Sequence, residues 1–197
     1  MSTHTSNNVS TIKQMPKQTY IPYLLQLFRQ YGYDGATLSK IAEATGLGKA
    51  SLYHHFPGGK DEMVETVLDY LEQWLGENIL QALRSDGNAE TKLGRMCDRL
   101  NELYQQGEQP CLFAILLLGS ARDIFHTKVE RLFRTWIDAI ASALIADGME
   151  EEQAKHRGED VAIAIQGSLI LSQGLHNPSP FQRVIQQLPR SICHNSQ

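Results

Sequence analysis

The sequence predicts an all-α fold: an N-terminal three-helix domain with a helix-turn-helix, then a C-terminal helical bundle, with about nine helices in total. Two observations support it. No segment alternates apolar and polar residues over a useful strand length, and past residue 18 apolar residues recur at helical spacing between Gly, Pro, Asn and Asp breaks. The chain of 197 residues, 42% hydrophobic and 20% charged, has the length and composition of a globular protein. Residues 15–60 are expected to form the first domain and residues 61–197 the second.

The first helix is predicted over about residues 17–31, where apolar residues share one face (Ile21, Leu24, Leu25, Phe28). Pro22 is acceptable because it lies in the first turn or two. Gly32 is expected to end the helix. Residues 1–14 show no such pattern and are expected to be unstructured.

Residues 37–60 indicate two short helices joined by a glycine turn. Thr37 is a good N-cap for a helix whose buried stripe is Leu38, Ile41, Ala42 and Thr45, and Gly46 provides the positive φ that the turn needs. The second helix is polar, basic and aromatic, and Leu47 and Leu52 are expected to cover the seam. Phe56 is expected to pack inward.

The second domain is predicted to contain six helices, over about residues 61–84, 89–106, 111–118, 120–146, 150–175 and 181–188. The helix over residues 61–84 would link the first domain to the body. Within the helix over 150–175, residues 161–174 are nearly uncharged, and a helix that is apolar around most of its circumference must be buried on two sides. One side can be its own core and the other a second subunit; the alternative is a central core helix within a monomer.

The charge is divided unevenly along the chain, whose net charge is −4. Residues 1–60 carry six basic residues against two acidic ones, a net charge of +4, whereas the remainder carries twelve against twenty, a net charge of −8. This asymmetry is expected if the first part meets phosphates and the rest does not.

Several classes of protein are disfavoured. The longest apolar run, residues 111–119, is too short for a bilayer, which needs about 20 residues, and the N-terminus has no signal pattern, so a cytoplasmic protein without membrane segments is expected. The three cysteines (Cys97, Cys111, Cys193) are widely spaced and form no metal or redox pair.

No motif for catalysis, a cofactor or a metal is present. The histidines include no His-x-x-x-His pair, the stretch from Gly46 to Ser51 breaks the phosphate-loop pattern, and no nucleophile elbow occurs. The sequence therefore predicts a protein that is not an enzyme and that holds no cofactor and no metal.

The second helix of the hairpin has the chemistry of a DNA reader. Lys49 and Ser51 can donate to base edges or phosphates, Tyr53 carries a hydroxyl on a rigid ring, and Lys60 can reach the backbone of the same groove. His54 and His55 are also available for the groove. However, glycine-turn hairpins are common in all-α proteins of other functions, so the hairpin alone does not decide.

The hairpin also carries a family pattern. The string Gly32-Tyr33-x-x-x-Thr37, then Ile41-Ala42-x-x-x-Gly46-Leu47, then Ser51-Leu52-Tyr53-His54-His55-Phe56 and Lys60 resembles the N-terminal domain of TetR/AcrR-type transcriptional regulators over about 45 residues. The resemblance implies an all-α homodimer, formed by the last two helices, that binds a palindromic operator in double-stranded DNA. It also implies that a small molecule bound in the body lowers operator affinity.

The resemblance assigns roles by residue. Those implied to face bases are Lys49, Ala50, Ser51, His54 and His55, joined by Ser39, and those implied to hold phosphates are Thr37, Tyr53 and Lys60. Two positions depart from the usual pattern. Gly48 stands where the family often has a serine cap, and Pro57-Gly58-Gly59-Lys60 has one residue more than the common form, which resembles the LmrA/YxaF-like subgroup.

By the same resemblance, the body is expected to contain a ligand pocket. Aromatic residues that could line it are Tyr104, Phe113, Phe125, Phe133 and Trp136, although aromatic residues at helical spacing also form plain cores. Charged residues that could orient a polar group there are Asp98, Glu102, Arg122 and Asp123.

Three functions remain open. The first is a repressor that a small-molecule effector releases from its operator. The second is a DNA-binding regulator controlled by a protein partner or by no effector, which a filled core in the body would favour. The third is a helical small-molecule-binding protein or enzyme in which the hairpin is only structural.

Overall fold

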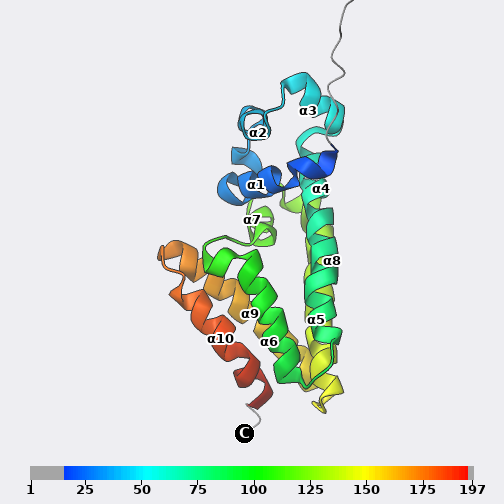
Figure 1. Cartoon of the computed structure of the whole chain (residues 1–197), viewed down its shortest axis with the longest axis vertical. Coiled ribbons are helices and arrows are strands. Elements are labelled where there is room, and N and C mark those ends of the chain that lie inside the picture. The colour runs from blue at the N-terminus through cyan, green and yellow to red at the C-terminus, as the bar shows by residue number, and fades with distance from the viewer. Residues whose placement is uncertain (1–15, 195–197) are drawn as a thin grey trace, which may run out of the picture.

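The computed structural model describes residues 16–194, and every regular element in this part is helical (Figure 1). The elements in chain order are η1 (Lys17–Tyr20), α1 (Ile21–Gly35), α2 (Leu38–Thr45), α3 (Lys49–His55), α4 (Gly59–Trp74), η2 (Leu75–Leu80), α5 (Gln81–Arg84), α6 (Ala89–Leu103), η3 (Gln105–Gly107), α7 (Leu112–Leu118), α8 (Arg122–Ala146), α9 (Glu151–Gly174) and α10 (Ser179–His194). The predicted all-α fold is confirmed. The expectation for residues 1–14, and Met15 at the predicted domain boundary, lie outside the described residues.

The hairpin forms as its local signals predict. The Thr37 side chain accepts a hydrogen bond from the Lys40 backbone N–H at 3.3 Å, which caps α2. Gly46 follows α2 with φ of 68°, the left-handed conformation that glycine adopts without steric penalty. Gly48 is the N-cap of α3, and no side chain caps this end.

The first and the last helix differ from the prediction. The chain leaves helical geometry at Gly32, where φ is 65° and ψ is −174°, but another short turn follows to Gly35. The last helix is longer than residues 181–188 and includes Pro189. Its apolar stripe continues at helical spacing through the buried residues Phe181, Ile185, Leu188 and Ile192, so packing outweighs the loss of the proline hydrogen bond.

The predicted linker helix is a long rod from the first domain into the body. It consists of α4, the π-helical segment η2 and α5, which run continuously along α8 (Figure 1). π-helical turns within α-helices are rare and frequently mark functional sites.

The buried residues form two clusters that do not divide at residue 60. The first contains Phe28, Ile41, Leu52 and Phe56 from the hairpin and α1, together with residues of α4, α7 and the beginning of α8. The second lies among η2, α5, α6, α8, α9 and α10. Because α7 packs against α1, the first domain contacts the body through α7 as well as through α4. Within residues 16–194, none of the helices combines the length and apolar composition that a bilayer crossing requires.

The crossing of α8 and α9 requires a glycine at residue 158. A Cβ atom there would lie 2.9 Å from the Ile137 carbonyl oxygen, a backbone atom that cannot move independently of α8. We expect Gly158→Ala to lower the free energy of unfolding by about 1–3 kcal/mol, measured by urea denaturation. Gly94→Ala is the matched control, since nothing lies within 4 Å of its added methyl group; it should raise the same quantity by about 0.5–1 kcal/mol.

Candidate nucleic-acid interface and cavity

The predicted DNA-contacting residues lie on the hairpin at one end of the molecule, far from α10 (Figure 1). Those with exposed side chains are Thr37, Ser39, Lys49, Ala50, Ser51, Tyr53 and His54, while His55 and Lys60 are half-buried. Leu52 and Phe56 on the opposite side of α3 are buried, so the prediction that Phe56 packs inward is confirmed. The α3 helix thus has one exposed polar face and one apolar face that packs on its own core.

His55 has a structural contact in addition to its predicted role. Its ring centroid lies 5.2 Å from that of Tyr20, which belongs to η1. Less of the His55 ring is therefore available to a DNA base than of the exposed His54 ring.

Lys60 is held in place by the residues around it. Its Nζ atom lies 4.1 Å from the centroid of the Tyr33 ring, and the Tyr33 hydroxyl donates a hydrogen bond to the Asp61 carboxylate. Burial, with a further contribution from Asp61, raises the pKa of Tyr33 to about 12, so its hydroxyl remains a donor at neutral pH. These contacts fix the ammonium group of Lys60 at the start of α4.

The turn with the additional residue is closed by Glu62. The Glu62 carboxylate accepts hydrogen bonds from the Gly58 backbone N–H at 2.7 Å and from Lys17, and the Lys17 hydrogen bond is the main cause of its lowered pKa. Gly59 takes up the extra length with φ of 65°. Lys17 is therefore engaged within the protein, which leaves less positive charge for phosphates than the sequence count suggests.

Gly48 and Gly46 provide a matched test of this hairpin, because a Cβ atom at either position would meet nothing within 4 Å. They differ in backbone conformation, with φ of −68° at Gly48 and 68° at Gly46. We expect Gly48→Ser to raise the free energy of unfolding by a few tenths of a kcal/mol by capping α3. Gly46→Ser should lower it by about 1–2 kcal/mol, and thermal denaturation of both variants measures the difference.

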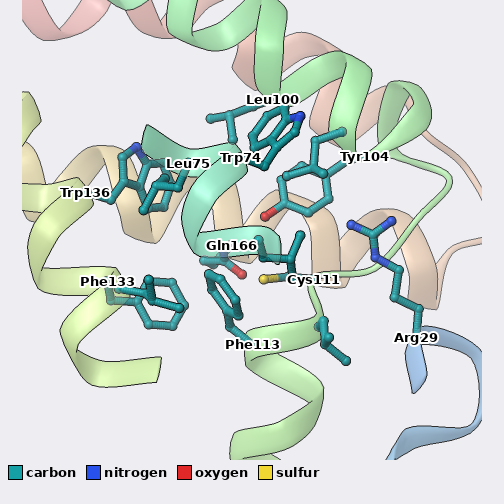
Figure 2. Close-up of a pocket in the computed structure, with 14 residues that line it drawn as sticks. Arg29, Trp74, Leu75, Leu100, Tyr104, Cys111, Phe113, Phe133, Trp136 and Gln166 are labelled. Carbon is teal, nitrogen blue, oxygen red and sulfur yellow. The ribbon is translucent and has the colours of Figure 1, made fainter. Parts of the chain in front are cut away.

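A cavity lies between the first domain and the body (Figure 2). Four of the five predicted aromatic residues line it, namely Tyr104, Phe113, Phe133 and Trp136. The volume of the cavity is about 40 Å³. The cavity is therefore narrow, and a ligand larger than a few waters has to push its lining apart.

Phe125 does not reach this cavity. It lies in the first buried cluster, where its ring centroid is 6.1 Å from that of Tyr33. Phe125 and Phe133 are both on α8, but eight residues of helix separate them by about 12 Å along the axis. Phe125 therefore packs beside the first domain, outside the cavity.

The polar lining also differs from the prediction. Asp98, Glu102, Arg122 and Asp123 are exposed, and none of them lines the cavity. The polar side chains found there belong instead to Arg29 of α1 and Gln166 of α9, beside Cys111 (Figure 2). Sequence signals for both existed: Arg29 follows Phe28 beside an apolar stripe, and Gln166 is a polar residue directly after the apolar run of residues 161–165.

Arg29 and Gln166 each have a buried atom without a hydrogen-bond partner, Arg29 Nε and Gln166 Oε1. The Arg29 side chain lies with its guanidinium carbon 5.9 Å from the centroid of the Tyr104 ring. Burial raises the pKa of Tyr104 well above its ordinary value. Within residues 16–194, no group of three or more His, Cys, Asp and Glu side chains is arranged to hold a metal ion.

Comparison with known proteins identifies both parts of the chain. Residues 24–67 match the model for bacterial regulatory proteins of the tetR family, and residues 89–187 match that for the transcriptional regulator LmrA/YxaF-like C-terminal domain. The chain is 24% identical over 168 residues to the HTH-type transcriptional regulator YxaF of Bacillus subtilis, covering 83% of this chain and 88% of YxaF.

Two further proteins are similar to this chain. A 58-residue stretch is 41% identical to IcaR of Staphylococcus aureus, the negative transcriptional regulator of a biofilm operon, covering 28% of this chain and 31% of IcaR. A structure of the regulator CifR with 26 bp operator DNA superposes with a TM-score of 0.76 at 17% identity, covering 91% of this chain and 98% of CifR.

The helix-turn-helix geometry, the helical body and both family matches lead to one conclusion. The chain belongs to the TetR family of helix-turn-helix transcriptional regulators, with a C-terminal domain of the LmrA/YxaF-like type.

Proposed function

We propose that the protein is a transcriptional repressor that binds a palindromic operator as a homodimer in the cytoplasm and is released by a small-molecule effector. The nine predicted DNA-contacting residues (Thr37, Ser39, Lys49, Ala50, Ser51, Tyr53, His54, His55 and Lys60) are the proposed contacts, with residues 15–60 as DNA-binding domain and 61–197 as effector-binding and dimerisation domain. The similarity to IcaR, a negative regulator, and to CifR, bound to operator DNA, supports this function.

The proposed response to a ligand is supported by one observation: residues of both domains line the same cavity. Arg29 of α1 and Trp74 of α4, next to η2, face the same space as Tyr104 and Phe133 of the body. An effector that widens this narrow space moves α1 and α4 relative to α8, and with them the α3 helices of the two protomers, which are the proposed recognition helices. Its effect on operator affinity equals its differential affinity for the two arrangements.

The homodimer is proposed through α9 and α10. On α9, Ile163 is 68% exposed and Ile170 is 59% exposed, and Leu171 and Gly167 are exposed on the same side. Within residues 16–194, the chain buries the opposite side of α9, with Val161, Ile165 and Leu169. A second copy that covers this apolar face would place two recognition helices on successive grooves of one palindrome.

The narrowness of the cavity favours a second candidate, a regulator of the same family without a small-molecule effector. Both candidates predict binding of the purified full-length protein to DNA upstream of its own gene, with an affinity that falls steeply as salt rises. Fluorescence anisotropy with a labelled duplex measures this binding, and an unrelated duplex is the control. A compound that releases the operator duplex supports the effector-responsive repressor, whereas binding that no compound alters supports the second candidate. Equal affinity for the two duplexes contradicts both.

A further inference from the structure

The cavity is lined by a cation, Arg29, to which no carboxylate within residues 16–194 supplies a counter-charge. Arg29 is only 9% exposed, and its Nε atom is buried without a hydrogen-bond partner. The groups that act electrostatically on it are Tyr104, Cys111 and Tyr70, and none of them is a carboxylate. Burial lowers the pKa of Arg29, but an arginine in a protein stays protonated. The charge of Arg29 therefore persists, and within residues 16–194 it has no ion pair with a carboxylate; its guanidinium carbon lies 5.9 Å from the Tyr104 ring centroid, at the outer limit of cation–π attraction.

An unpaired buried charge is among the least favourable features that a fold can keep, and replacement by an apolar side chain would ordinarily stabilise the protein. Packing does not require a charged residue at position 29, since the same helix buries the apolar residues Leu24 and Phe28 completely. A charge retained here is expected to serve a partner that brings the opposite charge.

The rest of the lining indicates the shape of that partner. Gln166 Oε1 is a second buried atom without a partner, and it accepts hydrogen bonds. Aromatic rings occupy the side of the cavity away from Arg29, where Phe113 and Phe133 stack edge to face at 5.6 Å (Figure 2). Because the cavity is small, a flat molecule enters with less displacement of the lining than a bulky one.

We propose that the effector is a planar aromatic carboxylate whose carboxylate pairs with the Arg29 guanidinium and whose ring lies among Trp74, Phe113, Phe133 and Trp136. A hydroxyl or N–H group on the ring can donate to Gln166 Oε1. Arginine binds carboxylates through parallel hydrogen bonds that fix orientation as well as charge. This proposal rests on the proposed ligand response, and it adds that the effector holds α1 of the DNA-binding domain directly, through Arg29.

Intrinsic tryptophan fluorescence can report binding in the cavity. Its two tryptophans, Trp74 and Trp136, both line the cavity, so quenching of intrinsic fluorescence measures occupancy. The probes are benzoate, cinnamate and 2-naphthoate, each compared with its primary amide, which has nearly the same shape and no charge. We expect at least one acid to bind the wild type about 10-fold or more tighter than its amide. Arg29→Gln should abolish this preference, and Arg84→Gln, at an exposed arginine outside the cavity, should preserve it.

A second measurement separates a ligand-binding role from a structural one. If Arg29 serves a ligand, Arg29→Met in the unliganded protein should leave the melting temperature unchanged or raise it by about 2–4 °C. A lower melting temperature together with equal binding of acid and amide would show that Arg29 supports the fold, and would overturn the proposal. Binding of none of the three acids, or a preference for the acid that persists in Arg29→Gln, would overturn it as well.

The operator assay distinguishes this proposal from the function on which it rests. An acid that binds through Arg29 but does not release the operator duplex leaves the anion site standing and contradicts the ligand response. Amides that release the operator as well as the acids, in wild type and Arg29→Gln alike, contradict the anion site and leave the ligand response standing.

Discussion

Alanine in place of both Tyr53 and Lys60 is expected to lower operator affinity about 100-fold or more, because each protomer of the proposed dimer would lose the two charge-assisted contacts to phosphate that we propose. Tyr53 is exposed on α3, and Lys60 is held at the start of α4 by the ring of Tyr33. Loss of one lysine–phosphate contact per protomer should also lower the slope of log affinity against log salt by about 2 for the dimer. Anisotropy titrations between about 50 and 200 mM NaCl measure both quantities.

The controls separate contact from folding. Lys92→Ala makes the same charge change on α6 of the body and should leave affinity and salt slope as in the wild type. Tyr53→Phe keeps the ring and removes only the hydroxyl, so it isolates one hydrogen bond. If the double variant melts at the wild-type temperature and still binds the operator with wild-type affinity, α3 meets DNA in a different register or serves only as structure.

The hairpin was predictable because its determinants are local. Thr37 caps α2 three residues away, Gly46 supplies the positive φ of the turn, and Leu52 and Phe56 face the core at helical spacing. Each signal depends on neighbours within one turn of helix, so the sequence alone carries it. The same holds for the departure at Gly59, where φ of 65° absorbs the extra residue before Lys60.

The cavity was only partly predictable, because its lining depends on how helices far apart in sequence are stacked. Phe125 and Phe133 look equivalent on α8, yet only Phe133 lies at the level of the cavity. Arg29 counted toward the basic N-terminal charge, but α1 turns it away from the DNA side and into the body. No local pattern specifies which end of a helix meets a neighbouring domain.

Aspartate in place of both Ile163 and Ile170 is expected to convert the protein from a dimer of twice 22.1 kDa to a monomer of that mass. The two residues are exposed and seven positions apart on α9, so they lie on one face. In the proposed dimer each aspartate would be buried against an apolar surface near its own copy, which combines loss of water with like-charge repulsion. Light scattering after size-exclusion chromatography measures the mass.

The same change should lower operator affinity about 100-fold or more while α3 remains folded. In a dimer, binding of one DNA-binding domain raises the effective concentration of the second at the other half of the palindrome, and a monomer lacks this advantage. Ile124→Asp is the control, since Ile124 is 52% exposed on α8, outside α9 and α10, and should leave the dimer intact. A double variant that remains a dimer would show that another surface joins the protomers. A monomeric variant with wild-type operator affinity would show that one hairpin is sufficient for recognition, and the apolar face of α9 would then need a different occupant.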